Sequence, residues 1–349
     1  MRLHAFILAA LLPLMAAAQK VQPDSLRRVT PYKIRHYQDA TAHKAASDII
    51  IIEEGAKTRS LMPYNCTASS GSAYAEIANT YKRKMPDVNV YCMIIPTAIE
   101  FYCPAMASKW TKRQYPVINN IHAHLSDSVY VVDVYTNLSH HTDEDIYSRT
   151  DHHWAPLGGF YAAEALAKTA GVPFRQLNEG YEECVIRRYV GSMYSFSKDI
   201  AVKNAPEDFV YHKPTDVEYT TTYITYKTEN LKIIGEYAPA QGTFFKTFKD
   251  GSGGAYCTFM GGDSKITTIR TGTKNGRRIL IFKDSFGNAV PGYLFYSFEV
   301  IHVIDGRFFN KNILKYVKDN QITDLVFANN SMHAISSSFI NAYKRFLVQ

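Results

Sequence analysis

Short apolar runs recur in the first half of the chain, separated by segments with helical spacing. Residues 47–52, 88–95 and 129–134 are apolar runs of strand length. Residues 72–84 place apolar side chains four positions apart on one face, and a second helix is expected around residues 116–125. This alternation of strands and helices is typical of a parallel sheet covered by helices.

The same alternation returns near the C-terminus. Strands are expected at residues 278–282, 300–304 and 324–328. Residues 286–298 are expected to be mostly helical, and a helix over residues 312–320 leads into the last strand. Because both halves of the chain carry the same pattern, we predict a single α/β fold with a parallel sheet flanked by helices.

The pattern changes in two other parts of the chain. Residues 19–46 are polar and carry two prolines, which indicates a lead-in segment rather than core. Within residues 207–273, polar and apolar side chains alternate as they do in antiparallel strands. We therefore predict one domain over residues 47–349, interrupted by a β-rich insertion at about residues 207–273.

The N-terminus resembles a secretory signal peptide. Arg2 gives it a basic start, residues 5–15 are apolar, and Ala18 ends a run of small residues suited to cleavage. We expect residues 1–18 to be removed and the mature protein to be periplasmic or secreted. No later stretch approaches the roughly twenty apolar residues that a membrane-spanning helix needs, so no transmembrane anchor is expected.

Charge and composition narrow the function classes. The formal net charge is +7, but the basic residues are dispersed, which argues against a nucleic-acid site and for mild attraction to anionic polymers. The 25 tyrosines fit either sheet faces or a sugar-binding cleft. No glycine-rich phosphate loop or dinucleotide fingerprint is present, so no cofactor is expected.

Cysteine usage leaves the disulfide pairing open. The five cysteines form no CxxC pair, and an odd number leaves at least one thiol over in an oxidising compartment. Cys92 and Cys103 are the nearest pair. Cys92 lies in an apolar strand, which favours a buried thiol at that position.

Residues 147–159 contain the closest group of potentially catalytic side chains, Asp151, His152 and His153. If this segment is extended before the next helix, Asp151 and His153 project to one side and His152 to the other. A carboxylate beside an imidazole orients the ring and stabilises the cation that forms when it accepts a proton. A pair of surface histidines beside an N-capping aspartate would give the same residue types.

A second segment places a serine at the end of a strand. The apolar run of residues 278–282 is followed by Lys283, Asp284 and Ser285, and a helix is expected to start directly afterwards. A serine on such a strand-to-helix turn exposes its hydroxyl and lies near backbone N–H groups, as in a nucleophile elbow. The alternative is an ordinary serine N-cap.

Together the two segments resemble a known family, the DHHW proteins. The resemblance extends from about residue 47 to the C-terminus, but it rests on two blocks, Arg149-Thr150-Asp151-His152-His153-Trp154 and Lys283-Asp284-Ser285-Phe286, the latter followed by Val303-Ile304-Asp305-Gly306-Arg307-Phe308-Phe309. That family is similar to the SGNH-hydrolase-like alginate O-acetyltransferases. The resemblance implies Asp151 as the orienting acid, His153 as the general base and Ser285 as the nucleophile.

This resemblance implies a serine-dependent O-acyl, and by likeness O-acetyl, esterase or transferase. Its substrate would be an envelope or extracellular polysaccharide or other glycan. An exported transferase has no direct access to cytoplasmic acyl donors, so a membrane partner that passes acyl groups across is part of this expectation. The sequence does not decide between esterase and transferase.

Other polar residues are candidates for a role in the site because of their positions alone. Asn329 follows a strand at the carboxyl end of the sheet, where ligands gather, and Asn329 or the Gly262 turn is a candidate oxyanion donor. Arg307 is a candidate for binding an anionic sugar or supporting Asp305. Ser192 is a rival nucleophile, but it lacks a strand-to-helix context.

Two other functions remain open at this point. One is a metal-dependent hydrolase, because imidazoles and carboxylates that could bind a metal lie close together in the chain: His140, His141, Asp143, Asp145, Asp151, His152 and His153. Their spacing matches no ordered zinc signature, and we predict no metal site. The other is a non-catalytic carbohydrate-binding or envelope-assembly protein on the same fold.

Overall fold

The computed structural model describes residues 27–349 except residues 55–56, 231 and 264. The expected signal peptide over residues 1–18, with its cleavage point near Ala18, therefore lies outside the described residues. Within the described part of the chain, no helix is both long and apolar enough to span a membrane.

Five parallel strands form the centre of the main sheet. Their order is β13-β12-β14-β4-β5, and all neighbouring pairs are parallel. Their side chains are almost entirely buried, because helices and loops cover both faces of the sheet. The five strands are β4 (Asn89–Ile95), β5 (Val129–Val131), β12 (Arg278–Lys283), β13 (Val300–Asp305) and β14 (Asp324–Asn330).

Antiparallel strands from the β-rich segment extend the sheet beyond its parallel strands. β11 (Lys265–Thr271) pairs antiparallel with β13, and β8 (Tyr219–Glu229) pairs antiparallel with β11. β10 (Ala240–Gly242) and β9 (Lys232–Glu236) both pair with β8. The β-rich segment adds its strands to the edge of the parallel core, so the sheet contains both parallel and antiparallel pairs.

Two small antiparallel sheets lie outside the main one. β1 (Thr41–Lys44), β2 (Ile50–Glu53) and β3 (Arg59–Leu61) form the first, and β6 (Tyr181–Tyr189) and β7 (Glu207–Pro214) form the second. The strand expected at residues 47–52 is thus β2, which starts later and does not join the main sheet. It starts later because Ser47 and Asp48 have positive φ angles, of 56° and 58°, which are incompatible with a strand.

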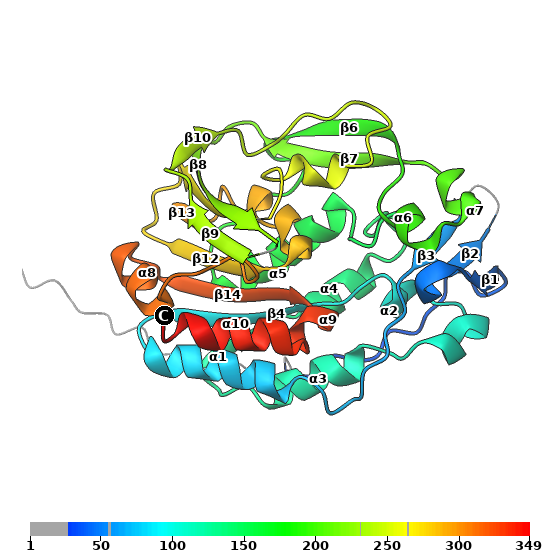
Figure 1. Ribbon diagram of the computed structural model, residues 1–349, viewed down its shortest axis with the longest axis horizontal. Coiled ribbons are helices and arrows are strands. Elements are labelled where there is room, and N and C mark those ends of the chain that lie inside the picture. Colours follow the sequence, from blue (N-terminus) through cyan, green and yellow to red (C-terminus); the bar gives the residue numbers. More distant parts are fainter. Residues whose placement is uncertain (1–26, 55–56, 231, 264) are drawn as a thin grey trace, which may run out of the picture.

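Helices cover the sheet (Figure 1). α1 (Ser72–Lys84), α3 (Tyr115–Ala123) and α10 (Ser337–Phe346) lie together on one side, whereas α4 (Val134–His140) packs against α5 (Pro156–Ala170). Short helices lie near the carboxyl ends of the strands and in the connections. They are α2 (Ile99–Tyr102), α6 (Met193–Ser197), α7 (Ile200–Lys203), α8 (Ile313–Asp319) and α9 (Ser331–Ala334).

The helix expected over residues 286–298 is absent, and this expectation is corrected. Two short 3₁₀ turns, η6 (Ser285–Ala289) and η7 (Pro291–Tyr293), occupy its place. Pro291 has no N–H to donate and Gly292 is a weak helix former, so an α-helix is not favoured here. The chain after Ser285 therefore continues as two short turns rather than as one α-helix.

Candidate active site

Ser285 lies on a turn directly after the carboxyl end of β12. The preceding Asp284 is buried, and its Oδ1 accepts the Phe286 N–H at 2.9 Å. Its Oδ2 accepts the Asn330 N–H at 2.8 Å, which ties this turn to the end of β14. Gly287 is required for the turn, because a Cβ at this position would lie 2.5 Å from Cβ of Lys283. The main chain around Ser285 is therefore held on both sides.

The loop that carries the two histidines is closed rather than extended. Tyr147 and Trp154 form an antiparallel bridge at its base. The Glu207 carboxylate accepts the N–H groups of Arg149 and Thr150, the latter at 2.8 Å, and the Thr150 hydroxyl at 2.6 Å. These bonds bend the chain, so the expectation of an extended segment was wrong. The bend still places Asp151 and His153 in contact.

The structure brings Ser285, His153 and Asp151 together in a line. The Ser285 Oγ lies 2.7 Å from Nε2 of His153, and Nδ1 of His153 lies 2.8 Å from Oδ2 of Asp151. Since a carboxylate only accepts, Nδ1 carries the hydrogen and Nε2 presents its lone pair to the serine hydroxyl. This arrangement allows His153 to remove the Ser285 proton.

Burial and hydrogen bonding determine the protonation states of Asp151 and His153. Burial disfavours the His153 cation and lowers its pKa, although Asp151 partly opposes that effect. Burial alone would raise the pKa of Asp151, but bonds with His152 and His153 hold that pKa well below its usual range. The site therefore pairs an ionised carboxylate with a neutral imidazole at neutral pH.

Ser192, the rival serine, supports Asp151 from the other side. Its Oγ–H and its N–H, the latter at 3.0 Å, both donate to Oδ1 of Asp151. Its Oγ also lies 2.6 Å from Nδ1 of His152. The Ser192 hydroxyl thus contacts the acid and not the Nε2 of His153. Sequence reasoning singled out this serine but did not place it beside Asp151.

An aromatic pair that sequence reasoning missed fixes the His153 ring. Tyr256 stacks on this ring, with centroids 3.9 Å apart and an interplanar angle of 6°. Its hydroxyl lies 2.9 Å from the carbonyl oxygens of Ser285 and Phe286, and it accepts a hydrogen bond from Nε1 of Trp154 at 3.2 Å. No local pattern around Tyr256 indicates this role, because its partners lie far away in sequence.

Three further predicted residues do not reach the pocket around Ser285. The Asn329 side chain is buried, and its Oδ1 accepts the hydroxyls of Tyr74 at 2.7 Å and Tyr343 at 2.8 Å. Arg307 pairs with Asp305 and Asp263 in a cluster with buried Lys283. Gly262 adopts a positive φ of 121° in the turn before Asp263. Asn330, the neighbour of Asn329, lines the pocket instead.

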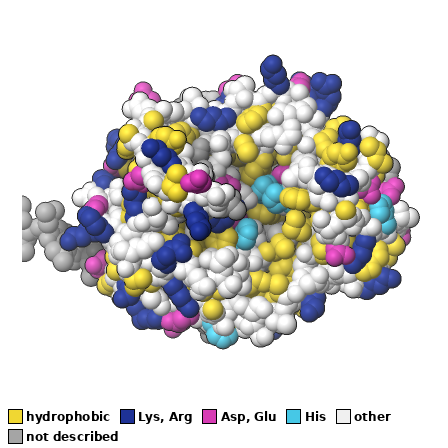
Figure 2. Space-filling view, viewed as in Figure 1, with side chains coloured by type: hydrophobic (Ala, Val, Ile, Leu, Met, Phe, Trp, Pro, Cys, Tyr) yellow, Lys and Arg dark blue, Asp and Glu magenta, His cyan; other side chains and the backbone are white. Residues whose placement is uncertain are grey.

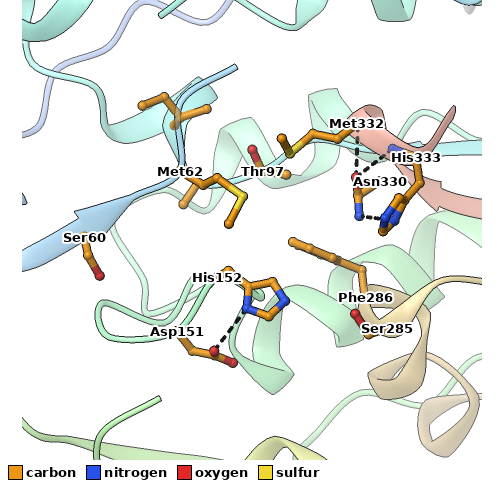
Figure 3. A pocket seen from close by; sticks show the side chains of 12 residues that line it. Ser60, Met62, Thr97, Asp151, His152, Ser285, Phe286, Asn330, Met332 and His333 are labelled. Carbon is orange, nitrogen blue, oxygen red and sulfur yellow. Dashed lines mark hydrogen bonds and ion pairs between the residues drawn. The ribbon is translucent and has the colours of Figure 1, made fainter. Parts of the chain in front are cut away.

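A cavity of about 240 Å³ opens beside Ser285 (Figure 3). Met62, Ile99, Phe286 and Met332 form apolar parts of its wall. Its polar lining includes Ser285, Asp151, His152, Asn330 and His333. Figure 2 shows histidine side chains in a hollow bordered by hydrophobic side chains on this face of the molecule. The cavity can therefore hold a ligand with an apolar part and several hydrogen-bonding groups.

The histidine-rich segment does not gather into one metal-ligand cluster. Among the described residues, Asp151, His152 and His153 form the one group of three or more whose potential ligand atoms all lie within 4.8 Å of one another. His141 instead stacks on Tyr161 and lies 2.6 Å from Glu144. The imidazoles and carboxylates of residues 140–153 are thus divided between different surroundings.

Comparisons with known proteins agree with the two motifs. The sequence model for the DHHW protein family matches residues 19–304. No curated protein matches the chain. A crystal structure of a DHHW family protein from Eubacterium siraeum is 36% identical, with a TM-score of 0.77, over 89% of this chain and 98% of the other.

Two structures of Bacillus cereus PatB1 have the same fold at lower identity. The structure with a sulfonyl adduct is 18% identical, with a TM-score of 0.64, over 86% of this chain and 98% of PatB1. The structure without the adduct is 17% identical, with a TM-score of 0.64, over 83% of this chain and 99% of PatB1.

Proposed function

Because this chain belongs to the DHHW protein family, we propose that it is an exported, serine-dependent O-acyl esterase or transferase of the SGNH type. Its substrate is an envelope or extracellular polysaccharide, and acetyl is the acyl group to test first. The observation that carries this proposal is the line Ser285 Oγ, His153 Nε2 and Asp151, joined at 2.7 and 2.8 Å beside a cavity that Ser285 and Asp151 line.

The first half of the reaction forms an acyl-enzyme. His153 takes the Ser285 proton as Oγ attacks the ester carbonyl carbon. The tetrahedral intermediate then expels the alcohol, which takes the proton from His153 as the carbon–oxygen bond breaks. Asp151 stays ionised and stabilises the transient imidazolium. Ser285 ends this half-reaction as an ester of the acyl group, and His153 is neutral again.

The second half of the reaction releases the acyl group. Water or an alcohol loses its proton to His153 and attacks the acyl carbon, and Ser285 leaves with that proton. Water gives a free acid, whereas a sugar hydroxyl gives a new ester. In both halves the carbonyl oxygen gains negative charge and needs hydrogen-bond donors. The Asn330 side-chain amide, which lines the cavity with Ser285, is our candidate donor in place of Asn329.

The direct experiment is hydrolysis of 4-nitrophenyl acetate by the mature protein, with and without a chelator. Release of nitrophenol that a chelator leaves unchanged is the result we expect from a serine mechanism. Release that a chelator abolishes would favour a metal centre at Asp151, His152 and His153. No release at all would contradict the proposal and favour a binding or assembly role.

The pH dependence tests the proton acceptor. Only neutral His153 can take the Ser285 proton, and burial moves its pKa below the ordinary value of 6.5. We therefore expect kcat/KM for 4-nitrophenyl acetate to fall on acidification with a midpoint below pH 6.5 and to stay level from there to neutrality. Stopped assays between pH 4 and 8 measure this limb. A midpoint at or above pH 7 would argue against a buried imidazole as the base.

Gly191→Ala tests how tightly Asp151 must be placed. A Cβ at Gly191 would lie 2.4 Å from Cβ of Asp151 and 2.7 Å from the Tyr189 hydroxyl, so the carboxylate has to move. Because a shift of about 1 Å costs up to about 100-fold in rate, we expect kcat to fall about 10- to 100-fold. Steady-state kinetics with 4-nitrophenyl acetate measure the change.

Gly235→Ala is the matched control for this substitution, since its nearest neighbour would be 3.7 Å away. It should leave kcat within about twofold of the wild type, because about 3.7 Å is an ordinary van der Waals contact. Full activity of Gly191→Ala in a folded protein would show that Asp151 tolerates displacement.

A further inference from the structure

A second pair of histidine and carboxylate lies next to the nucleophile. Asp284, which directly precedes Ser285, has its Oδ2 2.9 Å from Nδ1 of His333. His333 comes from α9, after the carboxyl end of β14, and its side chain is about one third exposed (35%). The proton transfers assigned to His153 do not use this pair. Its place beside Ser285 therefore needs its own explanation.

The surroundings of Asp284 fix the hydrogen on the His333 ring. Burial opposes ionisation of Asp284, but the bond with His333 and the N–H groups of Asn330 and Phe286 lower its pKa, so the carboxylate is charged. An ionised carboxylate only accepts, which places the hydrogen on Nδ1. The Asn330 Nδ2, 3.0 Å from the same nitrogen, is then not donating to it. In the neutral ring, Nε2 is left as an acceptor.

The His333 side chain forms part of the cavity wall. The His333 ring packs on Phe339, with centroids 4.5 Å apart, and lines the cavity that Ser285 also lines (Figure 3). Among the described residues, none forms a hydrogen bond to Nε2 of His333. A fixed acceptor without a protein partner, at the wall of a ligand-sized cavity, is suited to bind a donor of the substrate.

We propose that Nε2 of His333 accepts a hydrogen bond from one hydroxyl of a polyhydroxylated acceptor while a neighbouring hydroxyl attacks the acyl group on Ser285. This inference rests on the proposed function and selects its transferase branch. His153 takes the proton of the attacking hydroxyl and returns it to Oγ, and His333 exchanges no proton, so the reaction stays balanced. Water has no second hydroxyl to reach His333, so a vicinal diol of a saccharide is favoured over water.

The test measures how the acyl-enzyme divides between transfer and hydrolysis. The donor is 4-nitrophenyl acetate, and the acceptors are methyl glucoside and glycerol, with methanol as an acceptor that has one hydroxyl. Nitrophenol reports acylation, and mass spectrometry quantifies acetylated acceptor against free acetate. We expect the wild-type protein to acetylate the two polyols at a higher ratio to hydrolysis than methanol.

The decisive variant is His333→Asn. The asparagine amide nitrogen replaces Nδ1 as the donor to Asp284, but the variant has no counterpart of Nε2. We expect the ratio of transfer to hydrolysis with polyols to fall about tenfold, the effect of roughly 1.4 kcal/mol lost in one interaction. Both products come from the same acyl-enzyme, so this ratio does not depend on the rate of acylation. His333→Ala removes both contacts, and His124→Gln, at an exposed position on the surface, is the control.

The outcomes separate the two proposals. Wild-type protein that releases no nitrophenol would overturn the proposed function itself. Nitrophenol release without transfer to either polyol would overturn the role of His333 and leave an esterase. Transfer that His333→Asn retains but His333→Ala loses would assign His333 only to holding Asp284, and would also overturn the inference.

Discussion

Ser285→Ala is expected to lower kcat for 4-nitrophenyl acetate by roughly four to six orders of magnitude, as for loss of a serine nucleophile elsewhere. Without Oγ, no acyl-enzyme forms and the Nε2 of His153 has no proton to take. The fold should be unaffected, because the hydroxyl bonds only to His153 among the described residues and the turn is held by Asp284. Initial rates and the mass of protein treated with a sulfonyl fluoride measure the effect.

Ser192→Ala is the matched control for this experiment. It removes the rival hydroxyl, and with it a donor to Asp151, but it leaves the Ser285–His153 contact in place. It should retain sulfonyl labelling, whereas Ser285→Ala should lose it. Turnover that survives Ser285→Ala but fails with a chelator would exclude the serine mechanism and favour a metal centre.

Asp151→Asn is expected to lower kcat by about 10⁴-fold without unfolding the protein. Oδ1 of Asp151 accepts both the N–H and the hydroxyl of Ser192, so the amide oxygen of the new asparagine should take the place of Oδ1 and accept the same two hydrogen bonds. Its NH₂ group then faces Nδ1 of His153. This favours the tautomer with its hydrogen on Nε2, which cannot accept the Ser285 proton.

Kinetics with 4-nitrophenyl acetate and a circular dichroism melt measure this substitution. Asp127→Asn is a suitable control, because that side chain is largely exposed (78%) and lies at the surface. A variant that keeps more than about a tenth of wild-type kcat would show that Asp151 does not set the tautomer of His153, because a wrong tautomer costs about 10⁴-fold.

The local pattern of the sequence determined where the strands of the parallel core lie and where the reactive side chains occur along the chain. Apolar runs of strand length predict buried parallel strands because both faces of such a sheet are covered, and β4, β5, β12, β13 and β14 lie where those runs are. The serine after β12 and the pair of residues Asp151 and His153 were also visible locally. Their spacing of two residues allows a contact between neighbouring side chains.

Only the tertiary structure decided which distant residues complete the site. Ser285 and His153 are separated by 132 residues, and Asp284 and His333 by 49, so no local spacing indicates either contact. Glu207 bends the histidine loop from a different strand, and Tyr256 stacks on His153 from another segment. Side chains such as those of Glu207 and Tyr256 form hydrogen bonds with buried polar groups of distant segments. Which groups they reach depends on how the helices and strands pack.

The same distinction explains the corrected elements of the fold. Residues 47–52 are apolar enough for a strand, but positive φ angles at Ser47 and Asp48 and pairing with β1 and β3 place β2 in its own sheet. Likewise, Asn329 and Asn330 look equivalent in sequence, yet one faces two buried tyrosines and the other the cavity. The sequence by itself determined which segments are apolar and where reactive side chains occur, because these depend on neighbouring residues. Which strands pair and which way a side chain points depend on contacts between distant segments, so only the tertiary structure decided them.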